Sequence, residues 1–210
     1  DRVAPDPERV RTAAELLSGA QRPLVVAGGG VHLSRATAEL AELQERFALP
    51  VATTNMGKGS VAETHDLSLG VIGNAMGRRA LNHRLREYVT STDVVLLVGT
   101  RTNENGTDAW TLIPRDARVI HLDIDGTEVG RSYEATRLVG DARLGIRSLI
   151  DALAGIDGAS AAARRERLAA ELAALRGGET AEAAEAGAID PRQVMAALDR
   201  HVDADTIVVA

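Results

Sequence analysis

Cysteine is missing from the 210-residue sequence, and aromatic side chains are almost as scarce. Without cysteine the chain has no disulfide bonds or thiolate metal ligands, which are the usual marks of a small secreted scaffold or a zinc module. We therefore expect a cytoplasmic protein. Aromatic residues make up 2% of the chain, no basic stretch interleaves with them, and the net charge is −6. Nucleic acid is thus not an expected partner.

The sequence also lacks a hydrophobic run long enough for a membrane. The longest run in an expected strand covers residues 94–98, whereas a spanning helix needs roughly 20 apolar residues. Hydrophobic residues still make up 45% of the chain, which is enough for a sizeable core. The chain begins at Asp1 rather than at a methionine and stops abruptly at Ala210, so we expect a piece of a longer protein.

Apolar runs and amphipathic segments alternate along the first 155 residues. Asp6-Pro7 is a favourable helix start, with Asp as the N-cap and Pro at the first helical position. The alternation predicts an α/β fold built on a doubly wound, six-stranded parallel sheet. The expected strands cover residues 24–27, 51–54, 69–72, 94–98, 119–124 and 137–139, and the expected helices cover residues 7–17, 35–47, 79–89 and 141–153.

The composition changes after residue 155. Residues 156–187 are rich in Ala, Glu, Arg and Gly, and Leu168, Leu172 and Leu175 recur at helical spacing. We expect a helical linker here, in which residues 164–167 form a solvated helix face.

A second helix start follows at Asp190-Pro191. Val194, Leu198 and Val202 then share one helical face, and residues 206–210 have the pattern of a strand. These features predict that residues 188–210 are the truncated start of another α/β domain, and that residues 1–155 form the first one.

Glycine-bearing segments follow the first and fourth expected strands. In an open α/β sheet, ligands bind beyond the carboxyl ends of the strands, where the strand order reverses. If these two strands are neighbours, Gly28, Gly29 and Gly30 face the polar loop at 99–108 across a crevice. Glycine lets backbone N–H groups approach a phosphate, but three glycines also suit a tight strand-to-helix turn. The sequence leaves both interpretations open.

Three charged residues near this edge have two interpretations each. Asp123 and Asp125 follow the fifth expected strand, where a carboxylate could accept a hydrogen bond from a ribose hydroxyl or cap a turn. Arg101 could pair with a phosphate or remain a solvated loop cation.

Catalytic and metal sites are not indicated. The five histidines are scattered without metal-ligand spacing, and no nucleophile–base order or paired-carboxylate arrangement can be argued. His121, on an expected strand, is interpreted as a structural residue. Trp110 is interpreted as a packing residue rather than a base-stacking platform.

Several segments together resemble the central domain of the acetolactate synthase-like thiamine diphosphate enzymes. The segments read RPLVVAGGGV, FALPVATTNMGKGSVAETHDLSLGVIGN, TDVVLLVGTR, RVIHLDID and LVGDA, and they cover about residues 5–155 in the family's order. The most specific part is P-V-x-T-T-x-M-G-x-G followed by H-x-L-x-L-G. The tail at 189–210 resembles the opening of the family's diphosphate-binding domain.

This resemblance implies a Rossmann-like domain between two others that are missing here, one at each end. In the family those two domains hold thiamine diphosphate and Mg²⁺, and the parent enzyme is a homodimer or homotetramer that acts on C–C bonds of 2-oxo acids. The implied classes are transferase and lyase, including decarboxylases and carboligases, and the fragment by itself is expected to be inactive.

The family's central domain binds FAD in some members, ADP or a CoA moiety in others, and nothing in the rest. The resemblance carries its nucleotide contacts onto six segments of this sequence. The matching positions are Gly28, Gly29, Gly30, Thr54, Asn55, Met56, Ile72, Gly73, Gly99, Thr100, Arg101, Asp123, Ile124, Asp125, Gly140 and Asp141.

The sequence departs from the flavin-binding pattern at one place. Flavin-binding members carry R-F-D-D-R after the fourth strand, whereas this chain keeps Arg101 and continues with Thr102-Asn103-Glu104-Asn105. The loss of the acidic pair and the second arginine argues against FAD and leaves ADP or a CoA-like nucleotide as candidates. The alternative to an enzyme fragment is a free-standing regulatory domain that binds NAD, FAD or ADP.

Overall fold

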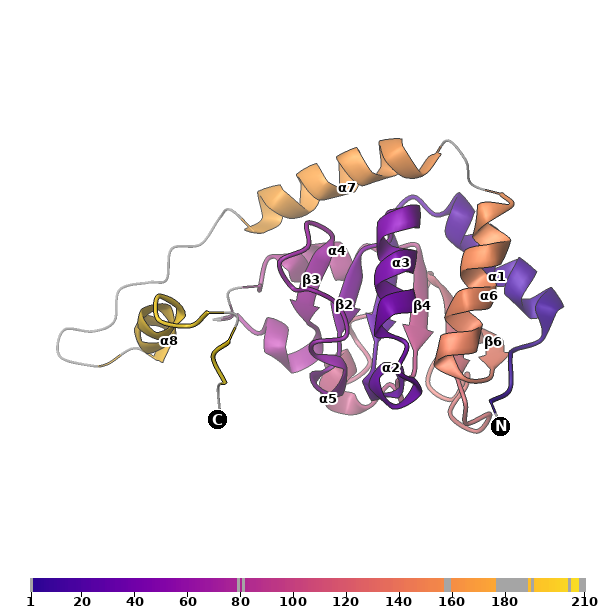
Figure 1. Cartoon of the computed structure of the whole chain (residues 1–210), viewed down its shortest axis with the longest axis horizontal. Coiled ribbons are helices and arrows are strands. Elements are labelled where there is room, and N and C mark those ends of the chain that lie inside the picture. The colour runs from indigo at the N-terminus through magenta and orange to yellow at the C-terminus, as the bar shows by residue number, and fades with distance from the viewer. Residues whose placement is uncertain are drawn as a thin grey trace. The chain divides into compact units, whose positions relative to one another are not determined.

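The computed structural model describes residues 2–78, 80, 82–156, 160–176, 189, 191–203 and 205–207. The chain divides into two compact units, residues 1–178 and residues 179–210. Figure 1 shows both, and each is described by itself.

The first unit is built on a six-stranded sheet in which every pair of neighbouring strands is parallel. Its order is β3-β2-β1-β4-β5-β6, which confirms the predicted doubly wound fold. Every residue of β1 and β4 is buried, because helices cover both faces of the central strands. The strands are β1 Pro23–Ala27, β2 Val51–Thr53, β3 Ser68–Val71, β4 Val94–Val98, β5 Arg118–Asp123 and β6 Ala135–Val139.

Helices pack on both faces of this sheet and enclose two apolar clusters. The predicted start of the first helix is confirmed, since Pro7 opens it and the Asp6 carboxylate accepts from the N–H groups of Glu8 at 2.9 Å and Arg9 at 3.0 Å. The α-helices of the unit are α1 Pro7–Gly19, α2 Gly29–Ser34, α3 Thr37–Phe47, α4 Leu85–Val89, α5 Glu104–Thr107, α6 Ala142–Ala154 and α7 Ser160–Arg176, and two short 3₁₀ turns cover Asn55–Gly57 (η1) and Gly73–Met76 (η2).

The helix expected at 79–89 is shorter in the structure. It begins at Leu85, and residues 82–84 form turns, while residues 79 and 81 lie outside the described residues. The Asn82 side chain explains the late start: its amide donates to the carbonyl groups of Leu69 at 3.5 Å and Val71 at 2.9 Å. These bonds to β3 hold Asn82 in a turn, as short polar side chains often do.

Helix α7 packs into the same unit as the sheet. It lies along the edge of the sheet opposite α2 and α5 (Figure 1), and Leu168 and Leu172 are fully buried beneath it. The predicted helix and its leucine stripe are therefore present.

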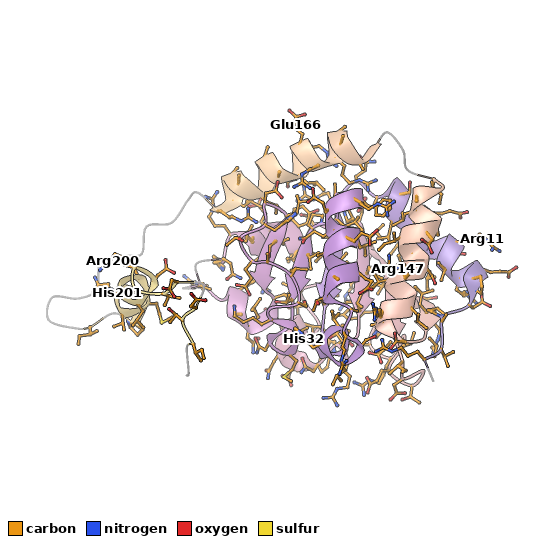
Figure 2. All side chains as sticks on the ribbon, viewed as in Figure 1. Arg11, His32, Arg147, Glu166, Arg200 and His201 are labelled. Atoms are coloured by element: carbon orange, nitrogen blue, oxygen red, sulfur yellow. The ribbon has the colours of Figure 1, made fainter. Side chains whose placement is uncertain are left out.

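The expectation that residues 164–167 form a solvated face is wrong for Arg164. Its side chain is buried, and it donates to the carbonyl oxygens of Ser18 at 2.6 Å and Phe47 at 3.2 Å. The reason is that its guanidinium group satisfies carbonyl groups in the last turns of α1 and α3, which lack a partner within their own helix. Glu166, by contrast, points away from the sheet (Figure 2).

The second unit contains helix α8, Pro191–Asp199, where a helix was predicted. Val194, Leu198 and Val202 are each more than two-fifths exposed. The strand predicted at 206–210 is not present at residues 206 and 207, and residues 208–210 lie outside the described residues. Thr206 instead closes a turn, because its hydroxyl donates to the Asp203 carboxylate at 2.6 Å. Within the described residues, none of the helices is long and apolar enough to cross a bilayer.

Candidate functional site

The strand order reverses between β1 and β4, which are direct neighbours. The segments after β1, β4, β5 and β6 therefore meet at the carboxyl edge of the sheet, where nucleotides bind in folds of this kind. The sequence analysis required the first and fourth strands to be neighbours, and the structure confirms that they are.

The glycine turn does not stand across an open crevice from the loop after β4, as was expected. The Gly28 N–H donates to the Val98 carbonyl at 2.8 Å, and the Gly30 N–H donates to the Gly99 carbonyl at 3.0 Å. A Cβ atom at Gly30 would lie 2.6 Å from the Gly99 Cα. The glycines are required because two backbones touch here, and these two N–H groups are engaged within the protein.

On the far side of the edge, over β2 and β3, the segment after β3 packs against the loop after β4. A Cβ atom at Gly73 would overlap the Asn105 carbonyl oxygen, and the Asn74 amide donates to the Asn105 side chain at 3.1 Å. The predicted contacts at residues 54–56 lie on this side, where the Thr54 N–H donates to the Ala27 carbonyl at 2.9 Å. The positions at 54–56 and 72–73 are not among the residues that line the pocket described next.

The open part is a pocket of about 140 Å³ over β4, β5 and β6. Five predicted positions line it and come from four separate segments: Gly30, Gly99, Asp123, Ile124 and Asp141. The sequence analysis missed three lining residues, Leu33, Ser34 and Ala142. Each lies within four residues of a predicted contact, in α2 or at the start of α6, so proximity to the matched motifs was the only available signal.

Asp141 is a buried anchor of the pocket wall. Its carboxylate caps α6 by accepting from the Leu144 N–H at 3.2 Å, and it also accepts from the Ser34 hydroxyl at 2.8 Å and the Arg2 guanidinium at 3.2 Å. Burial acts to raise the pKa of Asp141, but these hydrogen bonds and the Arg2 charge outweigh it and lower the pKa. The carboxylate is therefore ionised and fully engaged.

The other two carboxylates differ in availability. Asp123 is buried and lines the pocket, and one of its oxygens accepts from the Asp125 N–H at 3.0 Å. Asp125 is exposed and accepts from both the N–H and the hydroxyl of Thr127, at 2.9 and 2.7 Å. These bonds lower the pKa of Asp125 and make it a turn residue, whereas Asp123 remains the candidate for a ligand hydroxyl.

Arg101 is exposed, and its guanidinium makes no hydrogen bond or ion pair within the described part of the chain. It follows Thr100, whose buried carbonyl accepts from His121 Nε2 at 2.9 Å. Gly130 N–H donates to the other ring nitrogen of His121 at 3.2 Å, so Nε2 carries the proton in a neutral ring. Burial lowers the pKa of His121, which is a satisfied structural residue, as predicted.

A sequence model of the thiamine pyrophosphate enzyme central domain matches residues 10–149, which is about two thirds of the chain. The chain belongs to this family. A protein of Methanocaldococcus jannaschii named "Probable acetolactate synthase large subunit" is 38% identical over 72% of the chain and 25% of its own length. The acetolactate synthase of Arthrospira platensis is 39% identical over 66% of the chain and 24% of its own length.

The fold has a solved counterpart. An X-ray structure of a thiamin diphosphate-dependent enzyme from Mycobacterium smegmatis superimposes with a TM-score of 0.57, at 23% identity, over 72% of this chain and 28% of that one. This thiamine pyrophosphate enzyme central domain thus spans about a quarter of the length of its acetolactate synthase relatives.

The family implies Mg²⁺, which prefers carboxylate and other oxygen ligands. Among the described residues, no group of three or more histidine, aspartate or glutamate side chains is arranged to hold a metal ion. The residues present do not fit the metal that the family implies, so no step through that metal is assigned to this part of the chain.

Proposed function

We propose that this chain is the central domain of a longer thiamine diphosphate- and Mg²⁺-dependent enzyme that acts on C–C bonds of 2-oxo acids. The observation that carries the proposal is the match to the family's central domain together with relatives named as acetolactate synthases. Flanking domains of the same polypeptide supply the cofactor and metal sites, and the enzyme is a cytoplasmic homodimer or homotetramer with transferase or lyase activity.

Within that enzyme, the domain has a structural role and a small nucleotide pocket. The pocket is well below the roughly 300–1,000 Å³ of common ligand sites, at about 140 Å³. This size suits one end of ADP or of a CoA-like nucleotide and argues against an enclosed FAD. Arg101, which has no partner among the described residues, is a candidate cation for a phosphate, and the two glycine N–H groups described above are already engaged.

The activity is tested on the complete protein. With pyruvate, thiamine diphosphate and Mg²⁺, we expect carbon dioxide release with formation of acetolactate or another carboligation product, and loss of turnover when thiamine diphosphate is withheld. A complete protein that binds thiamine diphosphate but leaves a panel of 2-oxo acids unchanged would contradict the proposed reaction class.

The pocket is tested by calorimetry with ADP and FAD on the 210-residue chain. We expect weak, saturable ADP binding and no retained flavin. Asp123→Asn should weaken ADP binding roughly tenfold, since the pocket loses its acceptor for a ligand hydroxyl. Asp125→Asn is the matched control, because Asp125 lies two residues away and outside the pocket lining. Equal affinities of the two variants would place ADP elsewhere, and a yellow purified protein would refute the FAD prediction.

A further inference from the structure

A second and larger cavity lies at the amino ends of β5 and β6. Its volume is about 480 Å³, within the roughly 300–1,000 Å³ of ligand sites. The chain contains four aromatic residues in all, and two of them, Trp110 and Tyr133, line this cavity. It shares no lining residue with the pocket at the carboxyl edge.

The topology explains why this part of the sheet is open. The crossover from β5 to β6, residues 124–134, consists of turns and bends without a helix. Crossovers in a doubly wound sheet ordinarily carry a helix that covers one face of the strands they join. Here the first residues of β5 and β6, including Arg118, Val119 and Ala135, are left to line a cavity instead.

Trp110 is held at this cavity by an unusual backbone. Asp108, Ala109 and Trp110 have φ values of 48°, 53° and 59°, so three successive non-glycine residues are left-handed. The indole N–H donates to the Thr102 carbonyl at 2.8 Å, and Arg86 pairs with Asp108 at 2.6 Å. Backbone in this region is disfavoured for such residues and concentrates at functional sites. The indole itself is 48% exposed.

Three arginines around the cavity are available to a ligand. Arg9 comes from α1, Arg115 from the segment before β5, and Arg118 from the start of β5. None of their guanidinium groups makes a hydrogen bond or ion pair within the part of the chain that the structure describes. Asp116 and Glu134 also line the cavity, which leaves a net charge of +1.

We propose that this cavity binds a planar aromatic carboxylate. Trp110 and Tyr133 offer flat apolar surfaces for a ring, and a guanidinium group binds a carboxylate through two parallel hydrogen bonds. The two acidic side chains disfavour a multiply charged phosphate and leave room for one negative charge. The site is independent of the nucleotide pocket, so either can fail without the other.

The test uses the single tryptophan of the chain as a reporter. Trp110 fluorescence is excited at a wavelength longer than those that the probes absorb, and its emission is followed during titration with benzoate. Benzyl alcohol serves as the uncharged aromatic compound, and cyclohexanecarboxylate serves as the non-aromatic anion. We expect a saturable change with benzoate in the millimolar range and a much weaker response to the other two compounds. Amide shifts in an NMR titration should map to residues 110–119 and 133–136.

Single substitutions distinguish benzoate binding in this cavity from non-specific attraction to positive charge. Arg9→Gln and Arg118→Gln should each weaken benzoate binding roughly tenfold, because each loses a charge-assisted hydrogen bond. Arg11→Gln is the matched control, since Arg11 projects from the same helix as Arg9 but does not line the cavity (Figure 2). Circular dichroism establishes that each variant is folded.

Three outcomes would overturn the proposal: no saturable emission change in the native chain, equal affinity in all three variants, or amide shifts that map elsewhere. A response to benzyl alcohol equal to that of benzoate would likewise show that the arginines do not select the ligand.

Discussion

His121 illustrates how a buried titratable group is kept neutral. Its ring has a backbone partner on each nitrogen, the Thr100 carbonyl on one side and the Gly130 N–H on the other. Protonation would place a second N–H where Gly130 already donates, and it would put a charge in a buried strand. Burial is the largest cause of the lowered pKa, and it outweighs the Thr100 hydrogen bond and the nearby carboxylates, which act to raise the pKa.

The stability of the domain should therefore depend on this ring at mildly acidic pH. The unfolded chain takes up a proton near the ordinary pKa of 6.5, whereas the folded chain resists it. The contribution of His121 to the free energy of unfolding is therefore complete above that pKa and decreases as the pH falls below it. Urea unfolding between about pH 7.5 and 5 should show a smaller decrease in His121→Gln than in the native chain. Identical slopes would show that His121 titrates normally.

Asp141 combines a helix cap with two side-chain partners, Ser34 and Arg2. We expect Asp141→Ala to lower the free energy of unfolding by about 1–3 kcal/mol, since the cap is lost and buried donors are left unpaired. Asp151→Ala, at an exposed position of the same helix, should change it by less than about 0.5 kcal/mol. Chemical denaturation measures both, and a similar loss in the two variants would contradict the anchoring role of Asp141.

At the scale of elements, α7 is held to the sheet largely by arginine side chains. Arg167 donates to the Gln21 carbonyl at 2.6 Å, Arg176 donates to the carbonyls of Asp66 and Ser68, and Arg22 pairs with Glu171 at 2.5 Å. The leucine stripe of this helix was visible in the sequence as a 3.6-residue repeat. The partners of the arginines were not, because a backbone carbonyl carries no sequence signal.

Removal of the most buried of these arginines should loosen the helix. We expect Arg164→Ala to lower the free energy of unfolding by about 1–3 kcal/mol, because the carbonyls of Ser18 and Phe47 lose their donor and the buried side-chain stem is lost. Glu166→Ala, which removes a side chain that points away from the sheet (Figure 2), should have little effect. Hydrogen exchange of α7 amides provides the readout, and unchanged protection in Arg164→Ala would disprove the docking role.

At the scale of the whole molecule, the sheet could be predicted from sequence because its central strands, β1 and β4, are short apolar runs followed by turn-forming residues. The neighbouring placement of β1 and β4 then located the candidate site. The contact between the glycine turn and Gly99 could not be predicted, since glycine suits a bound phosphate and a touching backbone equally well. The left-handed turn before Trp110 was also invisible, because no glycine or asparagine marks those three positions.

We predict that the 210-residue chain alone binds no thiamine diphosphate and has no carboligase or decarboxylase activity. The physical reason is that its described residues offer no acidic cluster for the Mg²⁺ that would bridge the diphosphate. Calorimetry with thiamine diphosphate and Mg²⁺ should give only heats of dilution. Saturable binding would show that the chain contains a cofactor site of its own.

The way α7 is attached has an evolutionary consequence. Arg164, Arg167 and Arg176 contact main-chain oxygens, which every amino acid possesses, so residues 18, 21 and 68 could change identity without losing these contacts. Selection would act on one partner of each contact and not on the other. Correlated substitutions, which reveal many packed pairs in a protein family, would therefore leave no trace of these backbone contacts and would report only the side-chain pairs, such as Arg22 with Glu171.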